Sequence, residues 1–196
     1  MFKFVLPPAL LALGATGLLA QPVHEDGPGP NMVIEIAAAD GTSKGTITLD
    51  LLADVAPNHV ARLVELAQSG AYDGVVFHRV IDGFMAQTGD VQYGQHDGDT
   101  SMAGMGGSDL PDLEAEFSDI TFDAGTVGMA RAQDPNSANS QFFIDLAPAT
   151  FLDGQYTVVG QLIDGWDVLN AITKGDPAAN GAVDEPDYMV SVTIVE

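Results

Sequence analysis

Alternation of apolar and polar residues predicts most of the strands of this chain. The run 33–36 alternates, Asp40-Gly41 suits a tight turn, and 46–49 alternates again, so we expect a β-hairpin. Further strands are expected at 75–77 with Ile81, 126–130, 141–146, 156–162 and 188–195.

Two segments show helical spacing instead. In 57–70 apolar residues recur every three or four positions, Pro57 suits the first turn and Gly70 suits the C-terminal cap. A second helix is expected over 165–174, and the glycine-rich stretch 92–112 is expected to be a loop. Many short strands with two helices indicate a mainly β fold, namely a closed antiparallel barrel capped by helices.

The N-terminus has the pattern of a secretory signal peptide. Lys3 precedes the apolar run 4–19, and the small residue Ala20 follows it, although Leu18 does not suit the small-x-small pattern of a cleavage site. An uncleaved membrane anchor is the alternative, but this run is shorter than the ~20 residues of a typical span. Proline and glycine are frequent in the next segment and predict flexibility. We therefore expect a signal peptide over 1–20, a flexible tether over 21–31 and a folded domain over 32–196.

The strong negative charge restricts the classes of function. The chain has 28 Asp and Glu against 6 Lys and Arg, which gives a formal net charge of −22. Such a chain is not expected to bind nucleic acid or an anionic membrane surface, because both require a cationic face. The acidity serves either solubility or adaptation to a salty medium. Without cysteine the chain has no disulfide and no thiol nucleophile.

Common catalytic and metal-binding patterns do not occur in the sequence. There is no G-x-S-x-G or H-E-x-x-H motif, and 97–99 lacks the spacing of a calcium-binding loop. The glycines at 104–107 lack the strand and helix context of a dinucleotide site. We interpret the acidic tract 176–187 as a solvated loop, with calcium binding as the less favoured alternative. We therefore expect no cofactor and no metal.

One cation stands out against this background. Arg79 lies in strand-like apolar sequence, shortly before Phe84, Met85 and Gln87. Other residues that could complete an apolar pocket with polar groups are Gln141, Phe143, Phe151 and Leu152. From composition alone, ordinary core packing with Arg79 in an ion pair is the better interpretation.

The segment FHRVIDGFMAQTGD resembles the signature of the cyclophilin family of peptidyl-prolyl cis-trans isomerases. The similarity continues upstream in APNHVARLVELAQSGAYDGVV and downstream in GMARAQDPNSANSQFFIDLAPATFLDGQYTVVGQLIDGWDVL, and it favours bacterial cyclophilins. It covers roughly residues 32 to 196. The resemblance implies an eight-stranded antiparallel barrel closed by two helices, and an enzyme that accelerates rotation about X-Pro bonds.

The resemblance also assigns roles to single positions. The catalytic arginine of the family falls on Arg79, and the glutamine that grips substrate backbone falls on Gln87. The remaining substrate-binding positions are Phe84, Met85, Ala130, Arg131, Ala132, Gln141, Phe143 and Leu152, with Phe151 and Tyr156 at the rim of the pocket. Eukaryotic members carry Trp and His at those two rim positions.

The favoured hypothesis is a secreted isomerase, periplasmic if the host has two membranes. It would act as a monomer on proline-containing segments of exported proteins and assist their folding. The alternatives are a proline-peptide binding module with little turnover, and an acidic structural barrel without a site. Turnover on a prolyl peptide separates the first two.

Overall fold

The predicted hairpin forms where the alternation begins. The computed structural model describes residue 22 and residues 24–195, so the predicted signal peptide lies outside the described residues. Strand β1 (Asn31–Ala37) pairs antiparallel with β2 (Ser43–Leu51), and Gly41 takes a φ of 85° in the turn between them. That φ favours glycine because it has no Cβ.

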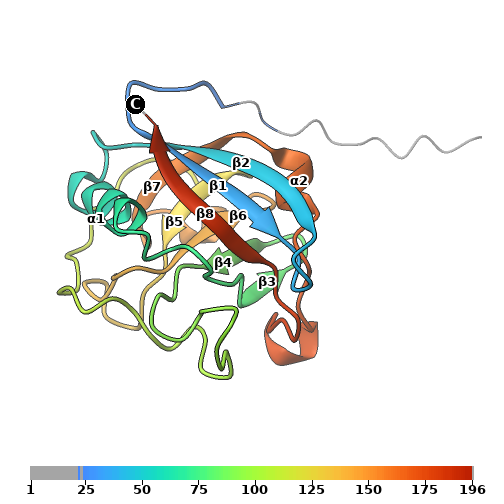
Figure 1. Ribbon diagram of the computed structural model, residues 1–196. Helices are drawn as coiled ribbons and strands as arrows, with labels where there is room; N and C mark the ends of the chain where they lie inside the picture. Colours follow the sequence, from blue (N-terminus) through green and yellow to red (C-terminus); the bar gives the residue numbers. More distant parts are fainter. Residues whose placement is uncertain (1–21, 23, 196) are drawn as a thin grey trace, which may run out of the picture.

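Six further strands continue the sheet, which curls into a half-barrel (Figure 1). They are β3 (Arg79–Ile81), β4 (Met85–Thr88), β5 (Thr126–Met129), β6 (Phe142–Asp145), β7 (Val158–Asp164) and β8 (Tyr188–Val195). All ladders are antiparallel, in the order β3-β4-β6-β5-β7-β2-β1-β8. The helices are α1 (Pro57–Gln68) and α2 (Trp166–Asn170), with 3₁₀ turns η1 (Thr150–Leu152) and η2 (Pro177–Ala179).

The prediction of a closed barrel is wrong. The end strands β3 and β8 form no ladder with each other. Only the segment before β3 reaches β8, through bonds such as Gly74 N–H to Met189 O at 2.7 Å. The outer edge of β3 is instead occupied by the loop around η2, since Val80 N–H donates to Gly181 O at 2.8 Å. Because β3 has only three residues, this loop is enough to cover it.

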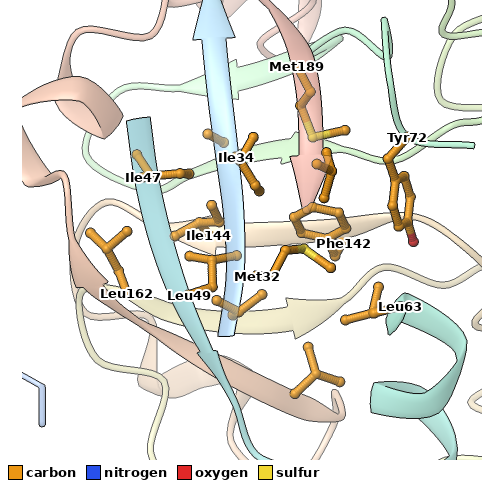
Figure 2. Packing of buried hydrophobic residues seen from close by; sticks show 14 of the residues in the cluster. Met32, Ile34, Ile47, Leu49, Leu63, Tyr72, Phe142, Ile144, Leu162 and Met189 are labelled. Carbon is orange, nitrogen blue, oxygen red and sulfur yellow. The ribbon is translucent and has the colours of Figure 1, made fainter. Parts of the chain in front are cut away.

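Apolar side chains from strands that face each other across the curl pack into the main core cluster (Figure 2), and a smaller separate cluster includes Phe122 and Phe143. The inward residues of β1 and β2, which include Met32, Ile34, Ile47 and Leu49, are fully buried. Phe142 of β6 packs edge-on against Tyr72 at 5.7 Å between ring centroids. Helix α1 covers this core beside β8 with its apolar face, and α2 packs against β2. The alternation and the helical spacing therefore identified the buried faces correctly.

Several local predictions differ from the structure. Strand β4 was not expected, of residues 75–77 only Val75 and Val76 form isolated bridges, and α2 ends at Asn170 rather than at 174. The described part of the predicted tether contacts both the sheet and α2, because Gly27 N–H donates to Asp50 Oδ2 of β2 at 3.1 Å and Trp166 Nε1 of α2 donates to Pro22 O at 3.1 Å. Among the described residues, no helix combines the length and the apolar character needed to cross a membrane.

Candidate active site

The hairpin of β3 and β4 brings Arg79 and Gln87 together. The two residues are directly opposite in the antiparallel register, so their side chains lie on the same face. Gly83 makes the turn between the strands at a φ of 68°. Arg79 Nη1 donates to Gln87 Oε1 at 3.1 Å. The pair predicted from the sequence is therefore a direct contact.

The other edge of the Arg79 guanidinium is held by a residue that the sequence analysis missed. Arg79 Nε donates to the Asn180 carbonyl oxygen at 3.0 Å, and Nη2 donates to Asn180 Oδ1 at 3.2 Å. Neither of the two ion pairs between described residues involves Arg79, so the core-packing interpretation with an ion-paired arginine does not hold. Partial burial lowers the pKa of Arg79, but a guanidinium stays charged at neutral pH.

A cavity of about 140 Å³ opens beside Arg79 and Gln87. Its other walls come from the turn before β4, from β4, β6 and η1, and from the loops after β5 and η1: Phe84, Met85, Ala130, Arg131, Phe143, Leu152 and Tyr156. The lining residue Phe143 is buried and packs on Phe122 at 5.9 Å and against the edge of Tyr156 at 5.8 Å between ring centroids. One water molecule takes up ~30 Å³, so the cavity has room for a few waters or, instead, for one small ring. It can hold a prolyl side chain beside a cation.

A second cavity of about 590 Å³ adjoins the first and shares Gln87, Ala130 and Arg131 with it. The predicted residues Ala132 and Gln141 line this second cavity. A hydrogen-bond chain connects the two, because Gln87 Nε2 donates to Gln141 Oε1 at 2.9 Å and Gln141 Nε2 donates to the carbonyl of residue 106 at 2.8 Å. The two cavities therefore form one groove.

The predicted loop 92–112 forms the far wall of this groove, and Asp90 holds it in place. The buried Asp90 carboxylate accepts four backbone N–H groups, at distances from 2.7 to 3.1 Å. The donors are Gln92, Tyr93, Gly104 and Gly106. Sequence reasoning missed Asp90, although an acid directly before a glycine-rich loop is a usable signal.

Arg131 lines both cavities. Its guanidinium lies 4.4 Å from the centroid of the Tyr156 ring, a cation–π contact. It also donates from Nη2 to Gln155 O at 2.9 Å and from Nη1 to Ala132 O at 2.9 Å. These contacts fix the segment 130–132. Among the described residues, the N–H of Arg131 and the carbonyl of Ala130 make no hydrogen bond, so both remain available to an extended peptide.

Phe151 lies outside the first cavity. Its side chain is 64% exposed, and its ring packs at 5.4 Å from that of Phe84, which does line the cavity. The structure thus brings eleven of the twelve predicted residues to the groove and places Phe151 on its outer rim.

Two buried titratable groups near the groove are neutral at pH 7. Burial lowers the pKa of His78 to about 4; the negative charge of Asp90 opposes this shift and the positive charge of Arg79 adds to it. Burial also raises the pKa of Asp145, which lies opposite Met85 in the β4–β6 register, to about 8. Within the described chain, no cluster of three or more His, Asp or Glu could hold a metal ion. Because His78 and Asp145 are neutral, neither of them compensates the positive charge of Arg79.

Comparisons with known proteins all point to one family. The family model described as cyclophilin type peptidyl-prolyl cis-trans isomerase/CLD matches residues 33–194. A probable peptidyl-prolyl cis-trans isomerase of Brucella suis biovar 1 is 56% identical over 152 residues, which are 76% of this chain and 78% of that protein. A peptidyl-prolyl cis-trans isomerase of Synechococcus elongatus is 42% identical over 137 residues, 69% of this chain and 87% of the relative.

Solved structures show the same fold. The crystal structure of cyclophilin AquaCyp293 from Hirschia baltica superposes with a TM-score of 0.69 and 27% identity, covering 86% of this chain and 74% of that one. A Cryptosporidium parvum cyclophilin type peptidyl-prolyl cis-trans isomerase, crystallised in the presence of the dipeptide Ala-Pro, has a TM-score of 0.70 and 25% identity. That superposition covers 85% of this chain and 99% of the other.

Proposed function

This chain belongs to the cyclophilin-type peptidyl-prolyl cis-trans isomerase family, and we propose that it isomerises X-Pro bonds through Arg79 and the adjoining apolar cavity. The observation that carries this proposal is the position, beside a cavity sized for one ring, of a guanidinium that makes no ion pair with any described residue. Isomerase activity itself follows from the family. The roles of the residues are those that the resemblance to the family implies, and the geometry of the groove supports them.

The reduction of the activation barrier that the enzyme must supply is modest. Rotation about an X-Pro bond crosses a barrier of ~20 kcal/mol and takes tens of seconds or longer. Turnover at about 10² to 10³ per second corresponds to a reduction of roughly 5.5–7 kcal/mol in that barrier. Such a reduction needs no covalent intermediate, so binding and electrostatic groups are sufficient.

Arg79 supplies stabilisation that exists only in the transition state. Twisting the amide ends its resonance and leaves a lone pair on the prolyl nitrogen. A guanidinium N–H can donate to this lone pair but finds no such acceptor in the planar ground state, so the contact raises kcat. A charge-assisted hydrogen bond of this kind contributes about 1.5–3 kcal/mol. Because the bonds to Asn180 and Gln87 go to neutral acceptors, Arg79 keeps its charge for this donation.

The groove holds the two sides of the rotating bond differently. The apolar cavity fixes the prolyl ring against Phe143, while Gln87 offers polar groups to the substrate backbone. The free backbone groups of Ala130 and Arg131 can pair with an extended peptide, as an added strand does. Recognition then depends on backbone and one proline, so we expect broad selectivity among the flanking side chains. The structure of the Cryptosporidium cyclophilin with Ala-Pro supports proline-containing peptides as substrates.

We further propose that the protein acts outside the cytoplasm, on exported proteins, and in the periplasm of a host with two membranes. The support is the sequence pattern of residues 1–20. Mass determination of the protein isolated from its host tests this proposal. A chain that begins near residue 21 is expected, and an intact N-terminus with a cytoplasmic location would contradict it.

A short Ala-Pro peptide tests the reaction. Exchange between its cis and trans forms, followed by NMR line broadening, is expected to accelerate by about four decades at saturating protein. A folded protein that binds the peptide without accelerating exchange would instead be a proline-peptide binding module.

A further inference from the structure

The acidic tract 176–187, which the sequence analysis interpreted as a solvated loop, is attached to the strand that carries Arg79. Val80 N–H donates to Gly181 O at 2.8 Å, and Gly175 N–H donates to Val80 O at 2.9 Å. On the other side of Arg79, Val183 N–H donates to His78 O at 3.2 Å. The loop, which contains η2 and is drawn in orange-red next to β3 in Figure 1, therefore lies along β3 and fixes the backbone on both sides of the arginine.

Close packing determines the shape of this loop. A Cβ on Gly175 would lie 1.9 Å from Gly181 O, and one on Gly181 would lie 2.4 Å from Ile81 Cγ1. The Asp176 carboxylate accepts Ala178 N–H at 2.8 Å, and the Asp176 carbonyl accepts Gly181 N–H at 2.8 Å. Only glycine fits at the two close approaches, so the loop has little freedom to move relative to β3.

Asn180 is the loop residue that reaches the site. Among the described residues it is the one non-glycine residue with a positive φ, 55°. Asparagine tolerates this left-handed conformation better than most residues. The conformation directs both its backbone carbonyl and its Oδ1 to one edge of the Arg79 guanidinium, at 3.0 and 3.2 Å. The edge formed by Nε and Nη2 is thereby held by two acceptors from a single residue.

The side-chain acceptor that Asn180 offers to Arg79 is neutral, although the surrounding tract is acidic. The tract contains Asp176, Asp184, Glu185 and Asp187, yet Arg79 bonds to the amide between them. Asp187 pairs with Lys44 at 2.6 Å, and Asp176 caps η2. The hydrogen-bonded side-chain oxygens on both edges of the guanidinium are amide oxygens, because Nη1 donates to Gln87 Oε1. The positive charge is therefore oriented without being neutralised.

We propose that Asn180 is a positioning residue of the isomerase, which orients the Arg79 guanidinium through a neutral contact and so preserves its charge for the prolyl nitrogen. This inference rests on the proposed role of Arg79. A guanidinium held on one edge loses less conformational freedom when it meets the transition state, so the effect falls on kcat. A carboxylate at the same place would hold the side chain but would compete with the prolyl nitrogen for its charge.

Two substitutions of Asn180 distinguish two effects on Arg79, namely the positioning of its side chain and the preservation of its positive charge. Asn180→Gly keeps the backbone carbonyl and tolerates the positive φ, but it removes Oδ1. Asn180→Asp keeps an acceptor and also tolerates the conformation, but it adds a negative charge. Matched controls in the same loop are Ala179→Gly, which adds a glycine, and Ala178→Asp, which adds a carboxylate to an exposed position.

The measurement is kcat and KM for an Ala-Pro peptide, with Tm as the check that each variant folds. We expect Asn180→Gly to lower kcat about three- to tenfold with KM within about twofold, and Asn180→Asp to lower kcat at least as much. Both controls should keep kcat and KM. In an Arg79→Ala background, Asn180→Gly should have no further effect, because the two residues act through one contact.

Wild-type kcat in either Asn180→Gly or Asn180→Asp would overturn the proposal. So would an additional loss of kcat from Asn180→Gly in the Arg79→Ala background, since a merely structural role would produce it. If Arg79→Ala itself retained full activity, the proposed function of Arg79 would fail instead. The two failures are therefore distinguishable within one set of proteins.

Discussion

Asp145 is a carboxyl group buried in β6 without a hydrogen-bond partner among the described residues, and its replacement by asparagine tests the electrostatics of the sheet behind the groove. Burial raises the pKa of Asp145 to about 8, whereas an unfolded chain has an aspartate pKa of ~3.9. The folded state therefore binds this proton more tightly. The stability that results is fully present below the unfolded pKa and is lost as the pH rises through the folded pKa.

The expected magnitude follows from proton linkage. Between the two pKa values, each pH unit changes the contribution of this group by ~1.36 kcal/mol. From pH 5 to pH 7 the wild-type protein should lose up to about 2.7 kcal/mol that Asp145→Asn does not lose. The stability of the variant relative to the wild type should therefore rise with pH over this range and level off above about pH 8. Any constant cost of burying an amide cancels in this comparison.

Urea unfolding at several pH values between 5 and 9 measures the effect. Trp166, the only tryptophan of the chain, reports the transition by fluorescence. Asp54→Asn, which removes an exposed carboxylate, is the matched control and should follow the pH dependence of the wild type. A difference between Asp145→Asn and wild type that stays constant from pH 5 to 7 would refute the reasoning, because Asp145 would then titrate alike in both states.

Three further predictions concern the pocket, helix α1 and the net charge. Phe143→Ala should lower the free energy of unfolding by about 3–5 kcal/mol, because a buried ring is lost, and should also reduce kcat/KM; unchanged values of both in urea unfolding and peptide turnover would contradict the assigned packing. Burial raises the pKa of Glu116, but bonds from His59 and Asn58 outweigh this and lower it overall. The stability that Glu116 provides is therefore present above its unfolded pKa and lost as the pH falls, so Glu116→Gln should reduce stability at pH 7 by about 1–3 kcal/mol and less at pH 3, as measured by urea unfolding. Finally, if the acidity is an adaptation to salt, Tm should rise from low salt to ~1 M salt, and a flat profile would leave solubility as the explanation.

Local patterns predicted the parts of the fold that depend on neighbouring residues. The strands 33–36 and 46–49 and the helix from Pro57 were found because alternation and helical spacing act within a few positions. Strand β4 was missed since Met85–Thr88 has no alternation and is paired on both sides. Closure of the barrel was wrong because it depends on whether the first and last strands of the sheet meet, which no local pattern encodes.

The candidate site shows the same division. Arg79 and Gln87 lie eight positions apart on one hairpin, and the resemblance to the family located them together with the pocket residues. Asn180 contacts Arg79 from 101 positions away, so neither spacing nor composition connects the two. The Asn-Gly pair at 180 and 181 signals a left-handed turn, but not the arginine that this turn contacts.

The most direct test of the central claim is peptide isomerisation by Arg79→Ala beside the wild type, with Tm measured for both. Since the Arg79 side chain donates, within the described part of the chain, only to Asn180, Gln87 and the sulfur of Met85, its loss should leave the fold intact. We expect kcat/KM on an Ala-Pro peptide to fall at least about tenfold, in line with one lost charge-assisted hydrogen bond. A folded variant that turns over at the wild-type rate would contradict the account and remove Arg79 from the mechanism.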